Sequence, residues 1–342
     1  MHRFLIITST LCCLSGLAAQ VDGPLRDASQ RIKTGFPKSD GYRVIVCGMT
    51  PKRHERVVQE LPFTLHFSED HTVFVPVRAR KPLGVVHVRS ESGEWGLVEI
   101  VWYFDLDLKI RDFSFQRCRS RAREQISTKE FRRQLAGKSI EQLLPLLSED
   151  CLSLQPKALD VATKSRSLAV VVVRSALKTI LATRYAWGDQ GELTDVLSVI
   201  QRVYPQALRF DRIDGLYSRA SETMLRKHLG PHGGKAIERR TAWLFRAYDA
   251  NSRSVGAVFR GDWRSGRQLT RLWWKLSPDR RVLGVMPDRK WPSQQVQKAF
   301  QGLRGMSLAG VPSSVTPSQL VTAEALLVID PHLKNLNAAS PR

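Results

Sequence analysis

Residues 82–115 read PLGVVHVRSESGEWGLVEIVWYFDLDLKIRDFSF, and residues 254–286 read SVGAVFRGDWRSGRQLTRLWWKLSPDRRVLGVM. Each stretch opens with a strand pattern that contains a glycine, passes through a turn, and ends in two segments rich in aromatic and β-branched residues. The opening glycines, Gly84 and Gly256, are 172 residues apart. A similarity that recurs at a fixed spacing indicates an internal repeat.

The repeat continues on both sides of the turn and beyond the strands. Trp102 and Trp274 are also 172 residues apart, and the helix-like segments that follow keep an offset of 168 or 169. The last match aligns Thr163 with Thr316, where the offset falls to 153. The second copy has therefore lost about fifteen residues before its threonine.

The repeat defines the organisation that we predict. A chain of 342 residues is long enough to bury two cores. We expect an α+β fold in which residues 41–187 and 190–335 form two tandem domains, each an antiparallel sheet packed with helices. Glycines and prolines within residues 20–40 indicate a linker before the first domain.

The first residues are typical of an export signal. Residues 1–19 combine a basic start with an apolar run from Phe4 to Ala19 and small residues near its end. We predict that this signal peptide is removed and that the protein works outside the cytoplasm, in the periplasm or secreted. An uncleaved segment that anchors the chain in a membrane is the alternative.

The chain is strongly basic, with 53 Lys and Arg residues against 32 Asp and Glu residues and a formal net charge of +21. In an exported protein this charge favours an acidic protein or an anionic membrane surface as partner, and we expect no nucleic acid. The densest basic cluster consists of Arg117, Arg119, Arg121 and Arg123. A solvated face is its simplest interpretation, and contact with an acidic partner is the alternative.

Three cysteines remain once residues 1–19 are removed, namely Cys47, Cys118 and Cys151. Their odd number and the lack of a CxxC spacing argue against a metal cluster or c-type haem. One disulfide is compatible with them, with its partners left open. The chain also lacks a nucleophile elbow, a nucleotide-binding loop and a His/Glu metal motif. We therefore expect no metal and no catalytic residue of the protein's own.

A Thr-x-Ser motif precedes an apolar helix pattern in both copies. In the first copy the motif spans Ala162, Thr163, Lys164 and Ser165, and in the second Thr316 and Ser318 take the corresponding places. The threonine hydroxyl can cap the unpaired N–H groups of the first helical turn. The same N–H groups, together with the helix dipole, can also hold a phosphate. We expect Thr163 both to cap the helix and to lie at this anion site.

The order of these features resembles the FMN-binding domain family, which includes periplasmic flavoprotein subunits of Rnf and Nqr electron-transport complexes and nitrous-oxide-reductase accessory proteins. That family has a glycine-containing strand, a strand pair, a helix that ends in a Phe…Gly-Lys segment, and a Ser/Thr-rich motif before a final helix. The matching residues are Leu83-Gly84-Val85, residues 97–110, Phe131 to Gly137-Lys138, and Ala162 to Ser165.

The resemblance implies that FMN is attached through a phosphoester to the hydroxyl of Thr163 by a separate flavin transferase. In the more divergent second copy the same role would fall on Thr316, with Ser318 beside it. Trp102 lies on a strand from which an aromatic ring could cover the flavin, and core packing is the alternative for this tryptophan. The chain departs from the family at Val161, where the family has a glycine two residues before the threonine.

Two functions are compatible with these observations. The first is an exported FMN-binding electron carrier that exchanges electrons with a redox partner protein or a membrane electron-transport complex. Such a protein is an electron-transfer flavoprotein, not a hydrolase or transferase, because the flavin supplies the chemistry. The second is a non-redox exported binding or assembly module that retains a decayed FMN-binding fold and uses its arginines to bind an acidic partner.

Overall fold

The structure is a computed structural model, and it describes residues 24–63, 65, 70–187, 190–215, 242–265, 268–279, 281–288, 290–291, 294–302 and 304–305. The predicted signal peptide, Thr316 and Ser318 lie outside these residues. The described residues include most of each of the two copies that the sequence predicts.

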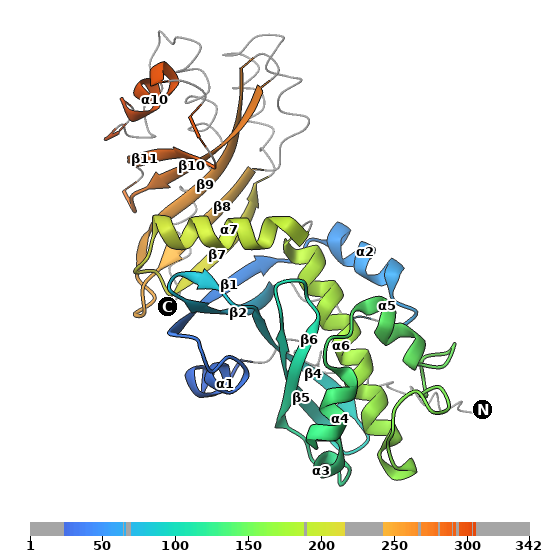
Figure 1. Cartoon of the computed structure of the whole chain (residues 1–342). Helices are drawn as coiled ribbons and strands as arrows, with labels where there is room; N and C mark the ends of the chain where they lie inside the picture. The colour runs from blue at the N-terminus through green and yellow to red at the C-terminus, as the bar shows by residue number, and fades with distance from the viewer. Residues whose placement is uncertain are drawn as a thin grey trace, which may run out of the picture.

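One continuous sheet runs through the described chain (Figure 1). Its strands are β1 (Gly41–Gly48), β2 (Asp70–Arg78), β3 (Lys81–Pro82), β4 (Val85–Gly93), β5 (Gly96–Phe104), β6 (Ile110–Arg117), β7 (Arg209–Gly215), β8 (Ala242–Tyr248), β9 (Ser254–Ser265), β10 (Gln268–Leu276) and β11 (Val282–Pro287). The order across the sheet is β11-β10-β9-β8-β7-β1-β2-β4-β5-β6, with β3 beside β2. Neighbouring strands are antiparallel except at the centre, where β1 and β7 pair in parallel.

The helices of the described residues are α1 (Ala28–Gly35), α2 (Pro51–Glu60), α3 (Arg123–Ile126), α4 (Lys129–Leu135), α5 (Ile140–Leu143), α6 (Arg166–Trp187), α7 (Gln190–Val203) and α10 (Gln294–Gln301). Two short 3₁₀ turns, η1 (Leu144–Leu146) and η2 (Thr163–Ser165), complete the set. Sheet and helices together confirm the α+β class.

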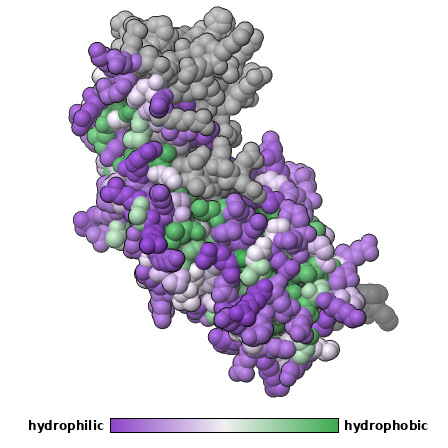
Figure 2. Space-filling view, in the orientation of Figure 1, coloured by the Kyte–Doolittle hydropathy of each residue, from purple (hydrophilic) through white to green (hydrophobic). Residues whose placement is uncertain are grey.

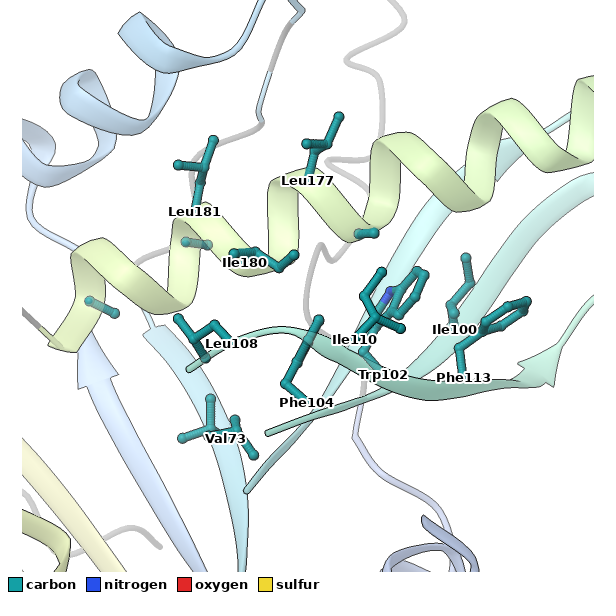
Figure 3. Close-up of a cluster of buried hydrophobic side chains, with 14 of the residues drawn as sticks. Val73, Ile100, Trp102, Phe104, Leu108, Ile110, Phe113, Leu177, Ile180 and Leu181 are labelled. Atoms are coloured by element: carbon teal, nitrogen blue, oxygen red, sulfur yellow. The ribbon is translucent and has the colours of Figure 1, made fainter. Parts of the chain in front are cut away.

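Helix α6 is the centre of the first half of the fold. Its 22 residues are apolar around most of the circumference, which is the pattern of a helix buried on all sides. Figure 3 shows Ile180 directed at the sheet residues Trp102 and Phe104, whereas Leu177 and Leu181 point away from the sheet. The outer side of α6 packs against α2, so the helix lies between the sheet and a second helical layer.

The opposite face of the same strands is covered by α1. Ile32 of α1 and Phe36, which directly follows this helix, are buried with Val88 and Tyr103 of the sheet. Residues 28–35 belong to the segment that we expected to be a linker. The finding adds a second small core to the first half of the fold, and it fixes the chain from Pro24 onward against the sheet.

The elements of the first half recur in the second at the spacing that the sequence predicts. Strands β5 and β10 begin 172 residues apart, as do β6 and β11. A Cβ atom on Gly84 would collide with the carbonyl oxygen of Phe104 and the ring of Phe36. At Gly256 the colliding groups are the carbonyl oxygen of Leu276 and the hydroxyl of Tyr204, which lie 172 and 168 residues further along the chain.

The halves are not separated by a linker in the described chain. The β1–β7 pairing joins their strands, and Ile200 of α7 and Trp273 of β10 belong to the same hydrophobic core as α6. The two halves therefore contribute to one sheet with a shared core.

Candidate functional site

The motif residues lie at the amino-terminal end of α6. Turn η2 begins at Thr163 and leads directly into α6, so a helix starts at Thr163 as predicted. Ala162, Thr163 and Lys164 are exposed, whereas Ser165 is fully buried. The Ser165 hydroxyl donates a hydrogen bond to the side-chain oxygen of Gln125 in α3. One residue of the motif is therefore structural, and three face solvent.

The expectation that Thr163 caps this helix is wrong. The capping position is held by Ala162, and no side chain caps η2 among the described residues. Thr163 already belongs to the turn, so its hydroxyl cannot reach forward to the N–H groups of the second or third helical residue. The N–H of Ser165 already donates to the carbonyl oxygen of Ala162 at 2.8 Å, which within the described residues leaves the N–H groups of Thr163 and Lys164 to solvent or to a ligand.

Contacts on two sides hold the start of α6 in place. The guanidinium of Arg166 donates to the carbonyl oxygens of Leu154 at 2.8 Å and Gln155 at 3.1 Å. The Ser165 contact with α3 holds the other side. As a result, the exposed Thr163 and Lys164 project from a fixed turn.

A shallow hollow of about 80 Å³ lies beside this end of α6. It is bounded by the turn between β4 and β5, by the segment after β6 and by the first turns of α6. Its lining residues are Ser92, Gly93, Glu94, Trp95, Gly96, Val98, Arg119, Ser120, Ser167, Leu168 and Val171. Trp95 is 52% exposed, and the guanidinium of Arg121 lies 5.7 Å from the centre of its ring. The hollow thus combines an aromatic ring with cationic groups.

The arginine cluster surrounds the same end of the sheet. All four arginines are exposed, and Cys118 and Ala122 between them are buried. Within the described residues, none of the four forms an ion pair. The region around α3, at the bottom of Figures 1 and 2, is mostly hydrophilic in that view. This exposure is what a solvated face requires.

Trp102 lies away from this end, inside the core. Its side chain is fully buried, and its indole Nε1 donates to the hydroxyl of Ser175 at 3.0 Å. The rings of Phe104 and Phe113 lie 5.9 Å and 5.2 Å from its ring. Ser175 is twelve residues after Thr163, which is about 18 Å along a helix that rises 1.5 Å per residue. Trp102 and the motif are therefore not brought together, and core packing accounts for this tryptophan.

A buried charged cluster was not expected from the sequence. Glu91 of β4 forms ion pairs with Arg89 at 2.8 Å and with Lys178 of α6 at 2.7 Å. Burial lowers the pKa of Lys178, the Glu91 carboxylate opposes this effect, and Arg89 and Arg174 add to it. A lysine in the middle of an apolar helix pattern was the available signal, because such a charge needs a buried partner.

Two buried histidines were also missed. The rings of His71 in β2 and His87 in β4 stack with centroids 4.5 Å apart. A ring nitrogen of His71 lies 3.0 Å from the hydroxyl of Thr183 in α6, and His87 contacts the backbone carbonyl of Thr72 at 2.8 Å. These contacts link the sheet to α6.

None of Cys47, Cys118 and Cys151 is in a disulfide, and all three are buried. Burial raises the pKa of both Cys118 and Cys151. In the part of the chain that the structure describes, no three His, Cys, Asp or Glu side chains are grouped so that they could hold a metal ion. Nor does any helix there combine the length and the apolar composition needed to cross a bilayer.

A scan of protein-family models and searches of curated proteins and of solved structures found no match to this chain. The chemistry of the site is therefore argued from its residues. An exposed hydroxyl and an ammonium group at a helix start suit the phosphate end of a ligand. At Val161 a β-branched side chain limits how closely the backbone can approach that phosphate.

Proposed function

We propose that the protein is an exported electron-transfer flavoprotein that carries FMN at the amino-terminal end of α6, attached through the hydroxyl of Thr163. The observation that carries this proposal is the position of Thr163 and Lys164, exposed on the first turn of a helix whose following turns are buried. A phosphate ester at Thr163 would meet unpaired N–H groups, the positive end of the helix dipole and the Lys164 ammonium group.

The flavin ring would lie beside this turn, along the hollow that Ser167 and Val171 border. Val171 is eight residues from Thr163, about 12 Å along the helix, a distance that a ribityl chain and ring can span. The hollow of about 80 Å³ is too small to enclose the ring, so one face of the flavin would stay open to solvent. An open face suits a carrier that passes electrons to a partner.

The proposal includes the rest of the flavoprotein interpretation. The two halves would be FMN-binding-like domains fused through one sheet, and a flavin transferase would attach FMN outside the cytoplasm. Electrons would then pass to a redox partner protein or a membrane electron-transport complex. An equivalent role for Thr316, with Ser318 beside it, remains a prediction from the repeat.

The test is the colour of the exported protein. Cells that co-express a flavin transferase should yield protein with flavin absorbance bands that persist after denaturation, because a covalently attached flavin stays with the chain. Thr163→Val, which keeps the side-chain shape but removes the hydroxyl, should yield colourless protein. Protein without any flavin absorbance would reject the carrier.

The second candidate is a non-redox binding or assembly module. It is favoured by the four arginines that lack ion pairs among the described residues, and by Trp102, whose ring is enclosed in the core and not available to a flavin. Such a protein would be colourless under the same conditions. Its binding to an acidic partner would weaken steeply as the salt concentration rises.

A further inference from the structure

One end of the sheet carries an exposed tryptophan among arginines. Trp95 stands in the tight turn between β4 and β5, with Gly93 and Gly96 paired on either side of it. It is the most exposed aromatic side chain of the described residues. We call Trp95 together with Arg117, Arg119, Arg121 and Arg123 the basic end. Arg121 lies over the Trp95 ring, so the aromatic and cationic groups are contiguous.

The charge of the basic end is positive after its acidic residues are counted. Glu94 and Glu124 are exposed there and offset two of the four arginines. Glu99, on the adjacent strand, is already engaged by Arg26 at 3.1 Å. The exposed Lys164 of the motif adds a further positive charge beside the hollow. Among the described residues, the basic end therefore keeps a net positive charge on exposed side chains.

The chain enters the fold at the same end. The carbonyl oxygen of Pro24, the first described residue, accepts a hydrogen bond from the side chain of Gln116 at 3.0 Å. Gln116 directly precedes Arg117, the first residue of the arginine cluster.

We propose that the basic end rests on an anionic phospholipid surface, with Trp95 at the level of the headgroups. Tryptophan favours the membrane interface because its ring is apolar and its N–H group can still bond to water. Each arginine near an anionic surface contributes about 1 kcal/mol of attraction. The proposal does not depend on bound flavin.

A lipid surface fits these features better than an acidic protein. A stable protein interface needs deep pockets for its central aromatic and arginine residues. The hollow at this end is about 80 Å³ and lies beside the protruding turn. A projecting tryptophan among arginines that form no ion pair within the described residues requires no complementary shape from a fluid bilayer.

The test is sedimentation of the full exported protein with vesicles. We expect binding to vesicles of phosphatidylcholine mixed with phosphatidylglycerol, and none to phosphatidylcholine alone. Arg121→Glu/Arg123→Glu should weaken binding at least about tenfold, because four units of charge are removed at the contact. Arg253→Glu/Arg304→Glu changes the net charge equally at exposed sites of the second half, so it should bind nearly as wild type does.

A second measurement locates Trp95. The difference in fluorescence between wild type and Trp95→Phe isolates the emission of Trp95 from that of the other tryptophans. This emission should shift to shorter wavelength with anionic vesicles. Equal loss of binding in both double variants, an unchanged Trp95 emission, or binding to an acidic protein but not to anionic vesicles would each overturn the proposal.

Discussion

Gly84 and Gly256 occupy matching places in the two halves of the sheet, and each lies under an aromatic side chain that leaves no room for a methyl group. The ring over Gly84 is Phe36, and Tyr204 lies over Gly256 with its hydroxyl donated to the carbonyl oxygen of Leu276. A contact built twice by residues 168 to 172 positions apart is a three-dimensional counterpart of the sequence repeat.

Alanine at either glycine should therefore destabilise the protein. We expect the free energy of unfolding to fall by about 2 kcal/mol or more for Gly84→Ala and for Gly256→Ala, since the added Cβ meets a backbone carbonyl that cannot turn aside. Gly48→Ala is the matched control, because nothing lies within 4 Å of a Cβ atom at that position. Denaturant unfolding measures all three, and an equal effect of all three changes would show that the contact is unimportant.

The buried cluster around Glu91 predicts that replacing this carboxylate with an uncharged amide lowers the free energy of unfolding strongly. Glu91→Gln leaves Lys178 and Arg89 buried without a carboxylate, which should cost about 3 kcal/mol or more. Lys178→Met in the Glu91→Gln background should recover part of this loss, because it removes one of the two uncompensated charges. A double variant as unstable as Glu91→Gln alone would contradict the assignment.

The same cluster predicts that the stability of the protein depends on pH. Burial lowers the pKa of Lys178 in the folded chain, so the unfolded chain binds the proton more tightly. Stability then rises as pH increases from the lowered pKa toward the ordinary value of 10.5. Glu91→Gln removes the carboxylate that opposes the lowering of the Lys178 pKa. The loss of stability caused by Glu91→Gln should therefore become smaller as pH rises from neutral. Thermal unfolding at a series of pH values measures this difference between wild type and Glu91→Gln. A difference that stays constant as pH rises from neutral would contradict a charged Lys178 at neutral pH.

The indole of Trp102 distinguishes a core role from a flavin role. Ser175→Ala leaves the buried Nε1 without an acceptor and should cost about 1–3 kcal/mol. Trp102→Phe in the same background should recover part of this cost, since no donor is left unpaired. In protein that binds flavin, Trp102→Phe should leave the flavin content unchanged. If Trp102→Phe lost flavin without losing stability, Trp102 would have to be assigned to the cofactor site.

Alkylation of thiols tests the cysteines and the signal peptide together. Chain processed after residue 19 should take up three alkyl groups in denaturant without a reductant, at Cys47, Cys118 and Cys151, because none is in a disulfide. The native chain should react slowly, since all three thiols are buried. Five alkyl groups would mean that Cys12 and Cys13 remain, and hence that the signal was not removed.

The sequence was informative where local pattern decides structure. The offsets that relate Gly84 to Gly256 and Trp102 to Trp274 follow from strands and turns with the same alternation, and the helix that starts at Thr163 follows from its apolar run. Pairing between distant strands leaves no such trace. The parallel contact of β1 with β7, which makes one sheet of the two halves, is set by residues over 160 positions apart.

Burial was also beyond the sequence pattern. The sequence pattern of a strand tryptophan is the same whether a helix or a ligand covers its ring. The contact of Trp102 with Ser175 in the structure shows that a helix covers it. The segment that contains Ile32 has the glycines and prolines of a linker, yet a few apolar side chains suffice to bury it on the sheet. Thr163 does not cap the helix because it is the first residue of the turn, and Ala162 holds the capping position.

The most direct test of the flavoprotein account is the intact mass of the exported protein after co-expression with a flavin transferase. Wild type and Thr163→Ser, which both keep a hydroxyl at this position, should gain the mass of one FMN, whereas Thr163→Val should not. Thr128→Ala, which removes an exposed hydroxyl at the start of α4, serves as the control and should gain the same mass as wild type. Wild type without added mass or bound flavin, or an undiminished mass in Thr163→Val, would contradict the assignment of FMN to Thr163.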